Sequence, residues 1–152
     1  MTAFASAVAG AERARRGLSA SFDVFALAIR LYIAYVFFLS GLTKIRDWDS
    51  TLFLFTEEYK VPLLPPDLAA YMGTAGELVL PVLLVLGLAG RFGALGLFIL
   101  NAVAAISYPG LAAAALKDHF LWGALLLVIL LHGPGKLSAD ALIWPRLLAK
   151  TN

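Results

Sequence analysis

Four stretches of apolar residues, each long enough or nearly long enough to cross a membrane as a helix, constrain this chain most strongly. Such a crossing needs about 20 mainly apolar residues. The stretches cover residues 24–42, 68–88, 92–108 and 120–132, and the last is short unless it begins within residues 111–116. A re-entrant helix is the alternative for this fourth segment. The pattern predicts an all-α integral membrane protein, a four-transmembrane-helix bundle.

Composition supports this class and excludes several kinds of chemistry. Hydrophobic residues make up 61% of the 152 residues, against roughly 45–50% in soluble domains. The chain has no cysteine, so it forms no disulfide, thiolate metal site or iron–sulfur cluster of its own. Its twelve Lys and Arg are scattered between the apolar segments instead of forming one basic face. Nucleic acid is therefore not an expected partner, whereas the lipid bilayer is.

Three regions follow from the segment boundaries. Residues 1–20 are predicted to form a basic tail, in which the arginines follow a weakly apolar stretch, the reverse of a secretory signal. A short surface helix or a frayed terminus are the alternatives for this tail. Residues 21–137 are predicted to form the transmembrane domain, and residues 138–152 a short C-terminal segment.

The connecting segments carry unequal numbers of cationic residues, and cations are retained on the cytoplasmic side. One side has seven: Arg13, Arg15, Arg16, Arg91, Lys136, Arg146 and Lys150. The other side has four: Lys44, Arg46, Lys60 and Lys117. Both termini are therefore expected in the cytoplasm, and the first connection outside.

The first connection, residues 43–67, combines apolar and polar residues in a way that suits a short helix lying in the membrane interface. Ser50 is the expected N-cap of this helix. Three prolines at positions 62, 65 and 66 end it, because proline lacks the backbone donor and disfavours helix in the preceding residue.

Polar residues inside the spans need partners, because a charge at the bilayer centre costs about 2.5–3.5 kcal/mol on insertion scales. Glu77 and Asn101 are each expected at a depth of about 15 Å, near the midplane, from a helical rise of 1.5 Å per residue. Arg30, about 9 Å deep by the same measure, either reaches Glu77 or extends towards the cytoplasm. The three residues form either a structural lock or the lining of a cavity for a quinone or another solute. In the second case Glu77 and Arg30 are the catalytic candidates.

The two histidines are spaced too far apart to share one haem iron. Thirteen residues separate His119 from His132, which is about 20 Å along a single helix. His132 is interpreted as an interfacial residue at a helix end. His119, which follows Asp118 at the outer surface, is a weak candidate for binding a metal; no other metal site is expected.

A conspicuous segment follows the fourth span. In residues 133–140, two glycines and a proline end the helix, and Ser138 is expected to cap the next segment. We interpret this element as a turn that fixes the C-terminal segment, with a functional site as the alternative. Residues 141–148 then form a short amphipathic piece that Pro145 is expected to break.

Together these features resemble the DoxX family of small four-helix bacterial membrane proteins. The matching pieces are Arg30-Leu31, Ser40-Gly41-Leu42-Thr43-Lys44, Val61-Pro62, Gly76-Glu77-Leu78, Leu86-Gly87-Leu88 with Arg91, and Gly133-Pro134-Gly135-Lys136-Leu137-Ser138-Ala139-Asp140. They extend from about residue 25 to residue 142. By this resemblance, Glu77 and Arg30 are family-like intramembrane polar positions, and the protein resides in the bacterial inner (plasma) membrane.

The resemblance implies a role in redox chemistry, because the family takes its name from a subunit of a thiosulfate:quinone oxidoreductase and other members are associated with oxidative stress defence. The leading hypothesis is a non-autonomous membrane subunit of a quinone-linked or stress-related oxidoreductase, with quinone as a non-covalent cofactor and other redox proteins as partners. Two alternatives remain, a non-enzymatic anchor or scaffold and a small solute carrier. A homo-oligomer is compatible with all three.

Overall fold

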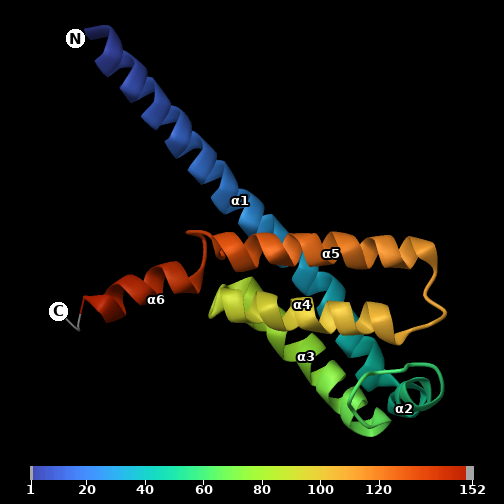
Figure 1. Cartoon of the computed structure of the whole chain (residues 1–152). Coiled ribbons are helices and arrows are strands. Elements are labelled where there is room, and N and C mark those ends of the chain that lie inside the picture. Colours follow the sequence, from blue (N-terminus) through green and yellow to red (C-terminus); the bar gives the residue numbers. More distant parts are fainter. Residues whose placement is uncertain (1, 150–152) are drawn as a thin grey trace.

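The computed structural model describes residues 2–149, and every regular element in that part of the chain is a helix (Figure 1). Lys150, which entered the charge count, lies outside the described residues. The helices are α1 (Thr2–Arg46), α2 (Trp48–Glu57), α3 (Pro66–Leu86), α4 (Gly90–Ser107), α5 (Ala113–His132) and α6 (Ala139–Leu148).

Four of these helices, α1, α3, α4 and α5, are long and apolar enough to cross a membrane, which confirms the predicted four-helix bundle. The fourth span begins at Ala113, several residues earlier than its apolar core. The charged pair Lys117 and Asp118 therefore lies inside the helix, near its first turns, and both residues are exposed. His119 likewise lies within the span, and not at the outer surface where it was expected.

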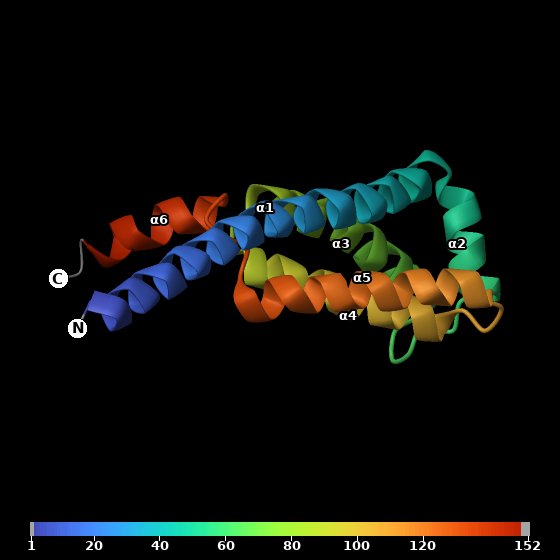
Figure 2. The same ribbon diagram turned by 90° about the horizontal axis from the view of Figure 1, so that it is seen from above.

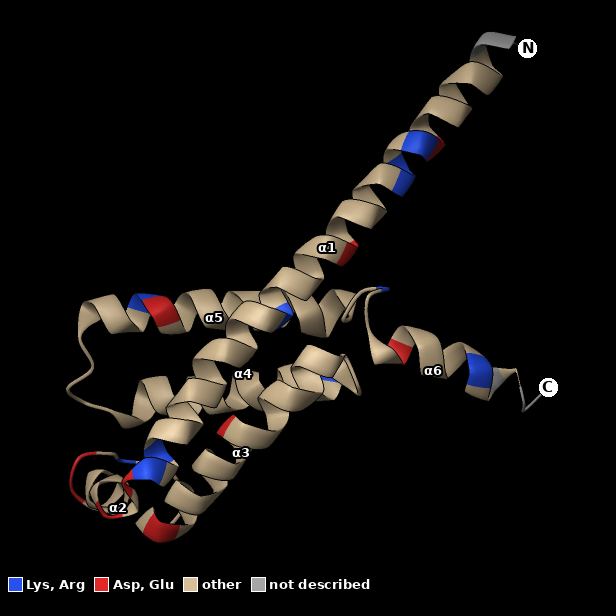
Figure 3. Ribbon diagram, turned by 180° about the vertical axis from the view of Figure 1, so that it is seen from behind, with Lys and Arg blue, Asp and Glu red and all other residues tan. Residues whose placement is uncertain are grey.

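Helix α1 is much longer than a membrane crossing requires. Its 45 residues correspond to about 67 Å, against a hydrocarbon core of about 30 Å. Residues 2–20 continue the helix of the first span without a break. This N-terminal half projects from the bundle on the same side as α6, opposite to α2 (Figures 1 and 2). Charged positions are concentrated on this projecting half, on α6 and around α2, and they are sparse along the middle of the bundle (Figure 3).

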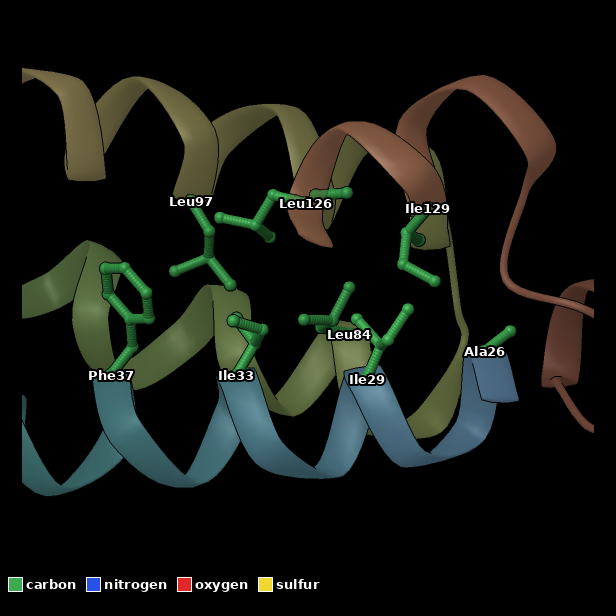
Figure 4. Close-up of a cluster of buried hydrophobic side chains, with 9 residues drawn as sticks. Ala26, Ile29, Ile33, Phe37, Leu84, Leu97, Leu126 and Ile129 are labelled. Carbon is green, nitrogen blue, oxygen red and sulfur yellow. The ribbon is translucent and has the colours of Figure 1, made fainter. Parts of the chain in front are cut away.

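The core of the bundle follows the helical periodicity of α1 (Figure 4). Side chains three or four positions apart lie on one face of a helix. On α1 these are Ala26, Ile29, Ile33 and Phe37, and they face Leu84, Leu97, Leu126 and Ile129 from the other three spans. All of these residues are buried.

The expected interfacial helix exists as α2, but its N-cap is Asp47 and not Ser50. The Asp47 carboxylate accepts hydrogen bonds from the Ser50 backbone N–H at 3.0 Å and from its hydroxyl at 2.6 Å. Ser50 is thus the third helical residue and the donor to the cap. A carboxylate is also favoured there by the helix dipole. A second cluster of buried residues, Phe55, Ala69 and Ala70, joins α2 to the start of α3.

The segment after α5 is a turn that ties three helices together. Ser138 caps α6 as expected, its hydroxyl accepting from the Ala141 backbone N–H. Asp140 accepts hydrogen bonds at 2.8 Å from the backbone N–H groups of Ala89 and Gly90, and so caps the start of α4. The expectation that Pro145 breaks the last segment is wrong, because α6 continues through it. The backbone group that proline leaves unpaired is tolerated in a helix outside the bundle, where water can reach it.

Candidate functional site

A cavity of about 560 Å³ lies between the four spans at the end of the bundle that α2 covers. Its walls are mainly apolar and come from all four spans, from α2 and from the loops beside it. The polar and aromatic side chains in the lining are Ser40, Lys44, Tyr59, Glu77, Ser107, Tyr108, His119 and Trp122. An apolar cavity with a few convergent polar groups is the usual form of a small-molecule site.

One polar group of the cavity is an ion pair between α1 and α3. The Lys44 ammonium donates to the Glu77 carboxylate at 2.6 Å and to the Ser40 hydroxyl at 2.9 Å. Both charged side chains are largely buried, with 19% and 13% of their surfaces exposed. The helices approach closely here because Gly41 has no side chain; an added Cβ would lie 2.9 Å from Leu78. Each charge thus has its partner inside the bundle, as intramembrane ions require.

A second polar group joins α4 to α5. Asn101 donates from Nδ2 to the backbone oxygen of His119 at 2.8 Å, and its Oδ1 lies 2.8 Å from His119 Nδ1. Trp122 stacks edge-on against His119, with ring centroids 5.1 Å apart. Gly123 leaves room for the amide, since a Cβ there would lie 3.3 Å from Asn101 Nδ2. His119 is therefore fixed at the cavity wall by contacts to both its backbone and its ring.

The loop after α2 covers the cavity at the α2 end of the bundle. The Lys60 backbone N–H donates to the Ser107 carbonyl at 2.6 Å, and the Tyr59 and Tyr108 rings pack edge-on at 5.5 Å. Burial raises the pKa of the Tyr59 phenol above its usual value, so this group stays a neutral donor. The Ser107 hydroxyl is buried in the lining and has no hydrogen-bond partner within the described residues.

Arg30 lies outside this cavity, and of the two alternatives for its side chain the contact with Glu77 is wrong. The guanidinium is buried and donates to the backbone oxygens of Val85, Pro134 and Leu137 at 2.7–2.9 Å. Fourteen residues separate it from Lys44 on the same helix, which is about 21 Å. Glu77, whose carboxylate binds Lys44, is thus far from Arg30 along the bundle. Arg30 anchors the turn after α5 and has no cavity-lining role.

Of the sequence-predicted site residues, the structure thus brings Glu77 and His119 to one cavity, with Asn101 behind His119. Within residues 2–149, no three His, Asp or Glu side chains gather so that they could hold a metal ion. Sequence reasoning missed Ser40 and Lys44, because Lys44 was assigned to the outer loop. The signal was available in the spacing: Ile33, Phe37, Ser40 and Lys44 recur every three or four residues, so they share one face of α1.

Comparison with known proteins agrees with this architecture. Residues 25–110 match the DoxX family. The chain belongs to the DoxX family. One relative, described as an uncharacterized protein of Haemophilus influenzae, is 33% identical over 126 residues, which cover 77% of this chain and 82% of the relative. No solved structure matches the chain.

The DoxX match runs from the middle of α1 through α4 and ends before α5. It therefore contains Lys44, Glu77 and Ser107, together with Asn101. His119 and the turn that Arg30 anchors follow the matched residues. The cavity of this DoxX protein is thus built from the matched region on three spans and completed by α5.

Proposed function

We propose that this DoxX protein is an inner-membrane subunit of a quinone-linked redox system, that its cavity binds a quinone headgroup, and that partner proteins supply the electrons. The observation that carries the proposal is the cavity itself, in which apolar walls enclose the Lys44–Glu77 pair. Its volume of about 560 Å³ is within the range of small-molecule sites, about 300–1,000 Å³. The redox chemistry is that of the bound quinone, which carries two electrons and two protons.

The residues present suit such a ligand. A quinone headgroup is a flat apolar ring with oxygen atoms at opposite ends, and it requires apolar walls with polar groups at more than one place. The cavity offers Lys44 with Glu77 on one side and His119 on another, and the unpartnered Ser107 hydroxyl adds a third polar group. A buried hydroxyl without a partner is costly unless a ligand or water meets it.

A long apolar tail also has a route out of the cavity. Met72 on α3 and Ile99 on α4 both belong to the lining, and 55% and 54% of their surfaces are exposed. The lining between these two helices is therefore only partly covered by other residues. A tail could pass there into the bilayer while the ring stays inside.

The protein's own contribution would be to orient the ring and to hold protons. Lys44 donates to Glu77 and Ser40, which fixes the ammonium at the wall. Glu77 contributes a carboxylate to the cavity lining and can take up or release a proton. Apolar walls exclude water and strengthen each of these polar contacts.

Extraction of quinone from the purified protein tests the proposal. The wild type prepared from native membranes in mild detergent should contain bound quinone, detected by its spectrum and by mass spectrometry. Gly73→Leu should remove it, because Gly73 lines the cavity and a Cβ there meets only Phe55, at 3.6 Å, so a larger side chain enters open space. Wild-type protein without quinone, or Gly73→Leu with undiminished content, would contradict the proposal.

Two charge-neutralising variants separate a specific site from general packing. Glu77→Gln should lower partner-dependent turnover by about 10²-fold, because the amide cannot take up a proton, while the protein still inserts. Glu57→Gln is the matched control, since Glu57 is exposed on α2 outside the cavity lining. Similar turnover in both variants would indicate that Glu77 only fixes helix packing.

We also propose that both termini face the cytoplasm, on the basis of the seven cationic residues against four. The projecting half of α1 and α6 would then lie on the cytoplasmic side, and α2 on the outside. Reporter fusions after Thr43, Arg91, Leu111 and Lys150 should report outside, inside, outside and inside. A cytoplasmic readout after Thr43 would reverse the whole arrangement.

A further inference from the structure

The contacts of Asn101 determine which nitrogen of His119 carries the proton. The Asn101 amide is oriented by its own NH₂ group, which donates to the His119 backbone oxygen at 2.8 Å. Its Oδ1 must then be the atom 2.8 Å from His119 Nδ1, and because a carbonyl oxygen only accepts, Nδ1 must be the donor. The ring is thus held with its hydrogen on Nδ1.

This tautomer makes the other ring nitrogen an acceptor. A neutral imidazole carries one hydrogen, so Nε2 presents a lone pair. His119 forms no ion pair within residues 2–149 that would favour a charged ring, and it packs against Trp122. No described protein group donates to Nε2. The cavity therefore has, at its α5 wall, an acceptor in need of a donor.

The Lys44–Glu77 pair, on α1 and α3, can both donate and accept hydrogen bonds. An ammonium has three N–H donors, and Lys44 uses two of them for Glu77 and Ser40. Glu77 accepts from Lys44 through Oε2, and a carboxylate has lone pairs on both oxygens for further donors. The Ser107 hydroxyl, buried and unpartnered, can also act in either role. A ligand hydroxyl suits these groups as well as a carbonyl does.

We infer that the cavity binds the hydroxylated, reduced form of its ligand, a hydroquinone, in preference to the matching quinone. His119 is the residue that determines this specificity, and Asn101 is a positioning residue that sets its tautomer. A hydroquinone O–H donates to His119 Nε2, whereas a quinone carbonyl would place a lone pair against a lone pair. The inference rests on the proposed function and adds the redox form that the cavity selects.

Equilibrium dialysis of the whole protein in detergent, under anaerobic conditions, tests the inference without any variant. The probes are tetramethylhydroquinone, its monomethyl and dimethyl ethers, and tetramethylbenzoquinone, with protein-free micelles as the blank. The hydroquinone should bind at least about tenfold more tightly than the quinone and the dimethyl ether, which cannot donate. The monomethyl ether, which keeps one O–H for Nε2, should stay close to the hydroquinone.

A variant then assigns the preference to one residue. His119→Phe keeps a ring and removes the acceptor, so hydroquinone affinity should fall about tenfold while quinone affinity changes less than twofold. His132→Phe is the matched control, because His132 stacks on Phe22 and does not line the cavity. Since the readout is a ratio of affinities, a partial loss of folded protein affects both ligands equally.

The outcomes separate this inference from the proposed function. If no probe binds above the micelle blank, both fail. If the quinone binds as tightly as the hydroquinone and Gly73→Leu abolishes both, the quinone cavity stands and the inference is overturned. If the wild type prefers the hydroquinone but His119→Phe keeps that preference, the role of His119 is overturned. Should His119→Phe not fold, the ether series on the wild type decides whether a donor is selected.

Discussion

Replacing Arg30 with Met should destabilise the protein more than any neutralisation in the cavity. The guanidinium donates to three backbone oxygens that belong to separate segments: Val85 at the end of α3, and Pro134 and Leu137 in the turn after α5. Methionine keeps the apolar part of the side chain and removes all three bonds. The perturbation therefore tests the anchor and leaves most of the packing intact.

The magnitude follows from what the missing donors leave behind. Removing a buried donor costs about 1–3 kcal/mol for each acceptor that is left unsatisfied. Leu137 lies near the surface, with 51% of its area exposed, so water can replace part of the loss. Arg30→Met is therefore expected to lower the free energy of unfolding by about 3 kcal/mol. Glu77→Gln should cost only about 1–2 kcal/mol, because the amide can still accept a hydrogen bond from Lys44.

Reversible unfolding in mixed micelles, followed by far-ultraviolet circular dichroism, measures these differences. Arg91→Met is the matched control: Arg91 makes one exposed hydrogen bond of 3.3 Å, to the Leu131 oxygen. Arg91→Met should lower the free energy of unfolding by no more than about 0.5 kcal/mol. If Arg30→Met is no more destabilising than Arg91→Met, the three hydrogen bonds do not anchor the turn and this reasoning is refuted.

Three further perturbations probe other contacts. Gly87→Ala should destabilise by about 1–2 kcal/mol in the same assay, because Gly87 has φ of +64° and a Cβ would collide with Ser138; an unchanged midpoint would contradict this. Gly41→Leu should separate α1 from α3 and cost about 1–3 kcal/mol or more, against a mild effect of Gly17→Leu in open space. The Ser50 donors lower the pKa of Asp47, so the cap stabilises α2 above the unfolded pKa of about 4 and is lost as the pH falls through the lower folded pKa. Hydrogen exchange of α2 should show that loss on acidification, but not in Asp47→Asn, which caps without a charge.

The spans and α2 could be predicted because they depend on local properties of the chain. Length and apolarity identify a crossing helix wherever it packs. The prolines at positions 62, 65 and 66 only limit how far α2 could extend, and the helix already ends at Glu57. The end of α1 was harder to predict from the sequence. Lys44 and Arg46 looked like loop residues, yet the helix continues to Arg46 because Lys44 finds Glu77 on the neighbouring span.

The partners of the polar residues could not be predicted from depth alone. Arg30 and Glu77 have opposite charges, but their pairing depends on where each lies along the bundle, and that is set by packing between helices. The terminal nitrogens of the buried arginine donate to backbone oxygens. Every residue carries such an oxygen, so the sequence does not indicate which ones the arginine binds. Similarly, His119 reaches Asn101 only because α5 begins at Ala113 and Gly123 allows a close approach.

The partners of Arg30 also impose an order on biosynthesis. Two of its three oxygens belong to residues 104 and 107 positions later in the chain. A ribosome working from the N-terminus delivers the first span long before those residues exist. Until Leu137 has been made, the arginine must remain hydrated or be held by the insertion machinery. The bundle can close around Arg30 only after Leu137 has been made, so a chain that stops before the turn should leave a charged first span for quality-control proteases to recognise.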